Sequence, residues 1–183
     1  MAKVLPEEPT VIDLSVQERN PAMEPDPHLH LGPRLSSYNP ATGALLGHVP
    51  LLGREGIDAA VRAAHEAQQI WARRSPRERA IALHQFNEAL VADADATARL
   101  ISMEQGKPVV EAMSIEMLSV LPQVKWLAEE GAKLLEGRAA PIHHPLFTAK
   151  QGCYEYEPMG VIAVISPWNY PFAIPTIQVM TAL

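Results

Sequence analysis

The segment that most constrains the fold is residues 160–172, GVIAVISPWNYPF, near the end of the sequence. It opens on an unbroken apolar run, Val161–Ile165, which is rich in β-branched residues. Such a short run is typical of a strand buried on both faces, as in a parallel sheet flanked by helices. Pro167 and Pro171 then end the strand, because proline continues neither a strand ladder nor a regular helix. Ligands in open α/β sheets bind beyond the carboxyl ends of strands, so we expect a functional site at residues 166–169.

Composition and charge narrow the functional classes. At 183 residues and 48% hydrophobic, the chain can bury a core as one domain or as parts of two. Its formal net charge of -6 argues against nucleic acid as a partner, because a polyanion requires a basic face. One cysteine excludes a disulfide within the chain and favours a reducing, cytoplasmic setting. No charged residue follows Pro158, but prolines interrupt that apolar stretch, so we expect no membrane span.

Residues 1–34 form a leader that differs from the rest of the chain. The leader is rich in proline and in acidic side chains, and no helical or strand period persists through it. Such a composition predicts a mostly disordered segment. A tail that binds a partner is the alternative interpretation. His28 and His30 lie in the leader without a third metal ligand nearby, so we expect no metal site there.

Beyond the leader, turn and cap signals predict a hairpin followed by helices. The turn Pro40–Gly43 separates two short apolar segments, which is typical of a β-hairpin. Ser75 and Glu78 have the spacing of a capping box, which marks a helix start. Pro122 should bend the last helix. Helices are expected at about residues 57–71, from residue 76 to Asp93, from Asp95 to about Met103, and over residues 109–135.

A short polar strand is expected between these helices and the apolar segment. Tyr154 and Tyr156 alternate with acidic residues, and this period of two predicts a half-exposed strand. Cys153 lies in the same strand. A catalytic thiol needs a base and a polarised site, and no cluster of His or Lys lies nearby in the sequence. We therefore do not expect Cys153 to be a nucleophile, and His143 with His144 makes a poor chelate.

Three motifs within this order of elements resemble the N-terminal part of the aldehyde dehydrogenase superfamily. In chain order they are YNPATG at residues 38–43, EQGKP at residues 104–108, and EPMGVIAVISPWNYP at residues 157–171. The resemblance covers residues 35–183 and excludes the leader. It implies an incomplete α/β fold: a hairpin, helical segments, an oligomerisation strand at residues 147–158 and the first strand of a nucleotide-binding sheet.

The resemblance also implies an activity. In that family a cysteine thiolate attacks an aldehyde, hydride passes to NAD or NADP, and water hydrolyses the thioester to a carboxylic acid. Asn169 matches the asparagine whose side-chain amide holds the oxyanion of the thiohemiacetal. The wall that borders the ribose and nicotinamide of the cofactor is matched by four consecutive residues, Ile165, Ser166, Pro167 and Trp168. The alternative for Asn169 is an Asx-turn that merely ends the strand.

Several groups of that family's machinery have no counterpart in these 183 residues. The nucleophilic cysteine, the general-base glutamate and the phosphate-side lysine lie further along the family's chain, and Cys153 precedes the Trp168–Asn169 loop. We therefore expect a fragment that does not oxidise an aldehyde by itself and that forms a homo-oligomer only when full length. The alternative is a non-catalytic remnant, or an interaction module that keeps the helices and the oligomerisation strand.

Overall fold

The computed structural model describes residues 33–147 and 149–183. Its helices are α1 (Arg54–Trp71), α2 (Pro76–Ala92), α3 (Ala94–Gln105), α4 (Val109–Glu111), α5 (Leu118–Leu134) and α6 (Ala173–Ala182). A π-helical segment, Ala112–Met117, joins α4 to α5, and a 3-10 turn covers Pro145–Phe147. The strands form two antiparallel pairs, β1 (Arg34–Tyr38) with β2 (Leu45–Pro50) and β3 (Arg138–Ala140) with β4 (Gly152–Tyr154).

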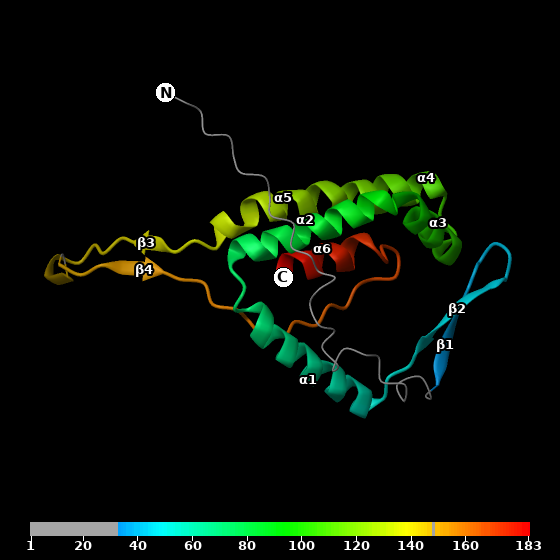
Figure 1. Ribbon diagram of the computed structural model, residues 1–183, viewed down its shortest axis with the longest axis horizontal. Helices are drawn as coiled ribbons and strands as arrows, with labels where there is room; N and C mark the ends of the chain where they lie inside the picture. Colours follow the sequence, from blue (N-terminus) through cyan, green and yellow to red (C-terminus); the bar gives the residue numbers. More distant parts are fainter. Residues whose placement is uncertain (1–32, 148) are drawn as a thin grey trace, which may run out of the picture.

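α2, α5 and α6 pack together at the centre, α1 lies apart from them, and the two hairpins project in different directions (Figure 1). α5 packs against both α2 and α6, and the π-helical segment packs against α3. The predicted leader lies outside the described residues up to residue 32, whereas Arg34 already belongs to β1. No helix in the described part of the chain is long and apolar enough to cross a membrane.

The predicted hairpin at residues 40–43 is confirmed. The Asn39 side-chain oxygen accepts hydrogen bonds from the backbone N–H groups of Ala41 (2.9 Å) and Thr42 (3.3 Å), which is an Asx-turn. Gly43 follows with φ of 71°, in the left-handed region that glycine adopts without strain. The Ser37 hydroxyl donates a hydrogen bond to the Glu104 carboxylate (3.0 Å), so the hairpin is tied to the end of α3.

The predicted capping box at the start of α2 is also present. The Glu78 backbone N–H donates to the Ser75 hydroxyl oxygen (3.3 Å), while the Ser75 backbone N–H donates to the Glu78 carboxylate (2.7 Å). Pro76 occupies the first turn, where its missing N–H costs no helical hydrogen bond. The hydrogen bonds from the Ser75 side chain and backbone, with the nearby charge of Arg74, hold the pKa of Glu78 below its ordinary value.

Ser75→Ala is expected to lower the free energy of unfolding by about 1 kcal/mol, because α2 loses its cap. Urea unfolding followed by circular dichroism measures the change. Since the folded-state pKa of Glu78 is lowered, its contribution is present above the unfolded-state pKa and is lost as pH falls through the folded-state value. The variant should therefore lose stability less steeply than the wild type in acid, and an unchanged acid profile would contradict this assignment.

The segment predicted as one long helix over residues 109–135, bent at Pro122, consists of three consecutive helical elements. α4 is a single turn, the π-helical segment follows, and α5 begins at Leu118 and contains Pro122. A proline in a helix lacks an N–H and presses on the carbonyl of residue i−4, here Leu118. The wider turns of the π-helical segment lie immediately before that carbonyl. π-Helical turns of this kind are frequent at functional sites.

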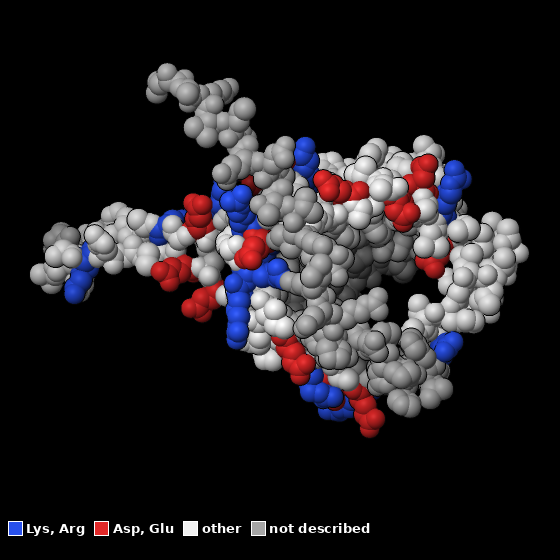
Figure 2. All heavy atoms as spheres, in the orientation of Figure 1, with Lys and Arg blue, Asp and Glu red and all other residues white. Residues whose placement is uncertain are grey.

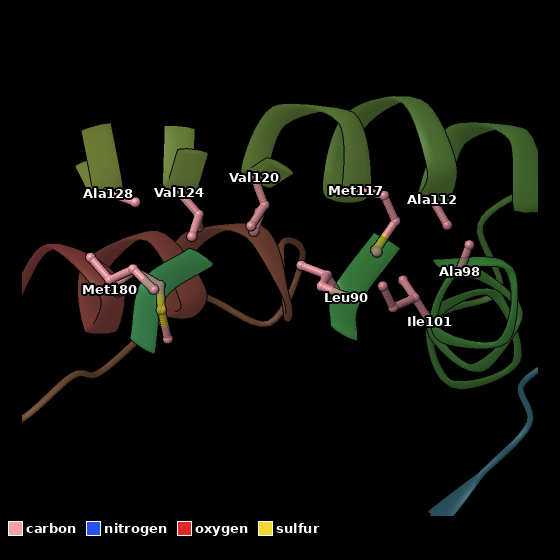
Figure 3. Close-up of a cluster of buried hydrophobic side chains, with 11 residues drawn as sticks. Leu90, Ala98, Ile101, Ala112, Met117, Val120, Val124, Ala128 and Met180 are labelled. Carbon is pink, nitrogen blue, oxygen red and sulfur yellow. The ribbon is translucent and has the colours of Figure 1, made fainter. Parts of the chain in front are cut away.

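The hydrophobic core lies between the π-helical segment with α5 on one side and α2, α3 and α6 on the other. Figure 3 shows Met117, Val120 and Val124 pointing from one helix face toward Leu90 of α2 and Met180 of α6. Glu116 lies on this buried side as well and has no exposed surface. The remaining core residues are Leu83, Ala98, Ile101, Ala112, Ala128 and Ala173.

The strand predicted at residues 161–165 is not formed. Residues 158–167 have no regular secondary structure, and the Ile165 side chain is 93% exposed instead of buried. A strand of a parallel sheet requires neighbouring strands for its N–H and C=O groups and helices over both faces. No described strand pairs with this segment. Instead, residues 159–161 lie beside α1, where they line a shallow groove.

The polar strand is shorter than the alternation of residues 154–157 indicates. β4 ends at Tyr154 and pairs with β3, so that the hairpin projects away from the helices (Figure 1). The oligomerisation role assigned to residues 147–158 stays a prediction. Charged side chains of both signs are interspersed along α1 and at the base of this hairpin (Figure 2).

Candidate functional site

Asn169 lies in the turn that precedes α6, and its side chain is exposed. Its amide group makes no hydrogen bond within the described part of the chain. The Asx-turn alternative predicts a hydrogen bond from a following backbone N–H to the asparagine side chain, as Asn39 has in the hairpin. The Asn169 side chain therefore does not form an Asx-turn, unlike the Asn39 side chain. Its two N–H donors remain available to a ligand.

The main chain at Asn169 is held by Lys107. The Lys107 ammonium group donates a hydrogen bond to the Asn169 backbone carbonyl oxygen (3.0 Å). The same ammonium group lies 5.2 Å from the centroid of the Tyr170 ring, within the range of a cation–π interaction. Lys107 thus contacts two consecutive residues of the turn, although it is distant in sequence.

The charge of Lys107 is balanced by Glu116, which the π-helical segment places in the core. Their N–O distance is 2.5 Å, and the side chains are 12% and 0% exposed, respectively. The other carboxylate oxygen of Glu116 accepts hydrogen bonds from the backbone N–H groups of Phe172 (3.2 Å) and Ala173 (2.9 Å). These two groups belong to the first turn of α6, where backbone N–H groups have no partner within the helix. A carboxylate there also complements the positive end of the helix dipole.

The EQGKP motif places Lys107 at this position. Gly106 ends α3 with φ of 75°, and a Cβ atom at Gly106 would lie 3.0 Å from the Pro40 side chain. The Ser102 hydroxyl donates a hydrogen bond to the Lys107 backbone carbonyl oxygen (2.7 Å), and Pro108 then begins the next helix. The motif therefore turns the chain so that Lys107 faces the π-helical segment.

The four residues predicted as a cofactor wall precede Asn169 directly. The side chains of Ile165 and Trp168 are 93% and 81% exposed, respectively. Ser166 is partly buried, and its hydroxyl oxygen is inaccessible and has no hydrogen-bond partner among the described residues. Pro167 is exposed and stiffens the segment between them. Ile165 and Trp168 are thus two uncovered apolar side chains, and the described residues build no opposite wall.

Cys153 does not belong to this site. It lies in β4, on the hairpin that projects away from α6 (Figure 1). It is exposed, and its sulfur lies 3.7 Å from a carboxylate oxygen of Glu155. That Cys153 is not a nucleophile stays a prediction.

Sequence reasoning missed Lys107 and Glu116 as members of the site. Lys107 lies in the EQGKP motif, for which the sequence indicates no role, and Glu116 belongs to none of the three motifs. A signal for Glu116 exists, since Ala112, Glu116 and Val120 recur every four residues on the apolar face. An acidic side chain on a buried helix face requires a charged or hydrogen-bonding partner. The sequence does not indicate which partner.

Most of the chain matches one family of known proteins. Residues 30–183 match the model of the aldehyde dehydrogenase family. A succinate semialdehyde dehydrogenase of Acinetobacter baylyi is 35% identical over 146 residues, which cover 80% of this chain and 29% of that protein. The NADP(+)-dependent succinate-semialdehyde dehydrogenase of Escherichia coli is 37% identical over 152 residues, with 83% and 30% covered. The chain thus spans less than a third of the length of these relatives.

Solved structures agree in fold. A succinate-semialdehyde dehydrogenase from Burkholderia pseudomallei superposes with a TM-score of 0.73 at 33% identity, covering 82% of this chain and 31% of the other. An NADP-dependent enzyme of Escherichia coli gives a TM-score of 0.73 at 34% identity, with 82% and 31% covered. These structures confirm the predicted fold class and the sequence resemblance.

Proposed function

Because this chain belongs to the aldehyde dehydrogenase family, we propose that it supplies the oxyanion-binding part of an enzyme that oxidises an aldehyde to a carboxylic acid. The observation that carries the proposal is the exposed side-chain amide of Asn169, which has no hydrogen-bond partner among the described residues and stands in a turn whose main chain Lys107 binds. An amide is suited to this role because it is a neutral donor. A carboxylate at the same place would repel the oxyanion, whereas an amide stabilises the negative charge that develops on oxygen.

In the proposed reaction, some of the catalytic groups belong to this chain and the others to the rest of the enzyme. A cysteine thiolate from outside these 183 residues attacks the aldehyde carbon, and the Asn169 amide N–H donates a hydrogen bond to the resulting oxyanion. NAD or NADP accepts the hydride when bound. Ile165, Ser166, Pro167 and Trp168 form the adjoining wall, which orients the cofactor and excludes water from one side.

The substrate we propose is a semialdehyde, and the setting a reducing cytoplasm. The proposal on the substrate rests on the names of relatives, which include succinate- and glutarate-semialdehyde dehydrogenases. The cofactor we propose is NAD or NADP, since the relatives include an enzyme named for NADP(+). The complete enzyme is proposed to be a homo-oligomer. The β3–β4 hairpin would form its interface, since this hairpin projects from the helices and exposes Tyr154.

A chimera tests the proposed function. Residues 33–183 are fused to the part of the Escherichia coli succinate-semialdehyde dehydrogenase that follows its matched region. We expect the chimera to reduce NADP+ in the presence of succinate semialdehyde, measured by the absorbance of the reduced nicotinamide. The 183-residue chain and the E. coli segment, each alone, should be inactive. A folded chimera that binds NADP+ without any turnover would contradict the proposal.

A further inference from the structure

We propose that Lys107 and Glu116 are positioning residues that set the direction of the Asn169 side chain. This inference rests on the proposed function of Asn169 and extends it to two residues that touch neither substrate nor cofactor. The two charges join three segments of the chain: the connection after α3, the π-helical segment and the turn before α6.

The pair holds the turn on both sides of Pro171. On one side Lys107 binds the carbonyl oxygen of Asn169 and contacts the Tyr170 ring. On the other side Glu116 binds the N–H groups of Phe172 and Ala173. Fixing the Asn169 carbonyl restricts the ψ angle of that residue. The Asn169 side chain can then contact a ligand from a main chain that Lys107 holds.

Burial makes this arrangement stiff. Glu116 has no exposed surface, so its charge has no access to water if either partner moves away. Hydrogen bonds between charged groups in such surroundings are short and are about twice as strong as neutral ones. The Pro171 ring further limits the backbone between the two anchored ends. Contacts across the fold therefore hold the turn.

A merely structural ion pair would act differently. Its loss would only lower the free energy of unfolding, whereas the loss of a positioning pair also changes the turn in molecules that remain folded. The surface pair Lys133–Glu130 provides a matched control. Its N–O distance is 2.8 Å, it is formed within α5, and both of its side chains are exposed.

Nuclear magnetic resonance of the 15N-labelled 183-residue chain tests the inference. In the wild type, the backbone amides of Phe172 and Ala173 should be protected from hydrogen exchange, although first-turn amides are ordinarily unprotected. In Glu116→Gln their exchange should become about tenfold faster, as expected from the loss of hydrogen bonds to a charged group. In Lys107→Met the Asn169 resonances should shift and broaden, and Lys107→Arg should restore part of the wild-type spectrum.

The control Glu130→Gln should leave all of these signals unchanged. Unprotected Phe172 and Ala173 amides in the wild type would overturn the inference, and this measurement requires no variant to fold. Unchanged Asn169 signals in a folded Lys107→Met would overturn it as well. In the chimera, Lys107→Met should lower kcat about tenfold or more while KM for NADP+ changes little. An inactive parent chimera would count against the proposed function. The hydrogen-exchange result would still test whether Lys107 and Glu116 hold the turn, because it is measured on the 183-residue chain.

Discussion

Replacement of Glu116 by leucine is expected to lower the free energy of unfolding by about 3–5 kcal/mol. The substitution leaves the Lys107 ammonium group, only 12% exposed, without its counter-charge. It also removes the acceptor for the N–H groups of Phe172 and Ala173 at the start of α6. Urea unfolding followed by circular dichroism measures the loss.

Two further variants show whether the loss comes from the uncompensated charge. Adding Lys107→Met to Glu116→Leu should recover part of the stability, since an apolar pair leaves no buried charge. Glu130→Gln breaks an exposed ion pair and should cost about 0–1 kcal/mol. A Glu116→Leu variant as stable as Glu130→Gln would show that the buried pair contributes little to the fold.

The second large effect is expected at Asn169, and it concerns catalysis instead of stability. In the active chimera, Asn169→Ala should lower kcat by about 10²–10³, which corresponds to about 2.7–4 kcal/mol of transition-state stabilisation. KM for NADP+ should change little, because the lost hydrogen bond forms only as the oxyanion develops. Steady-state kinetics with succinate semialdehyde measure both constants.

Asn39→Ala is the matched control for this experiment. Asn39 has the same amide group, but it is committed to the hairpin turn. Its loss should reduce the stability of the hairpin and leave kcat unchanged. Asn169→Asp should be at least as impaired as Asn169→Ala, because a carboxylate repels the oxyanion. Full activity of Asn169→Asp would rule out the oxyanion role.

Local sequence signals predicted the elements that depend on near neighbours. The hairpin at residues 40–43 and the capping box of Ser75 with Glu78 are both present. Each depends on contacts a few residues apart, so the sequence pattern contains both partners. The end of α1 at Trp71 also agrees with the prediction, whereas its start at Arg54 lies three residues before the predicted start at residue 57.

The prediction at residues 161–165 was wrong because a strand of a parallel sheet is not a local structure. β-Branched apolar residues suit such a strand, but its hydrogen bonds must come from other strands. The described residues place none beside it. The apolar pattern therefore indicates a segment that needs neighbouring strands and covering helices. Ile165 is exposed, so the described residues do not cover it.

The sequence by itself determined the family, the order of the elements and the position of Asn169 directly after an apolar segment and before a helix. Only the tertiary structure decided how that asparagine is held. Lys107, Glu116 and the turn before α6 are far apart in the chain, and no periodicity connects them. A buried carboxylate must be neutralised by whichever charge the fold brings within reach. That partner is selected by three-dimensional packing, and here it is the lysine that fixes the Asn169 main chain.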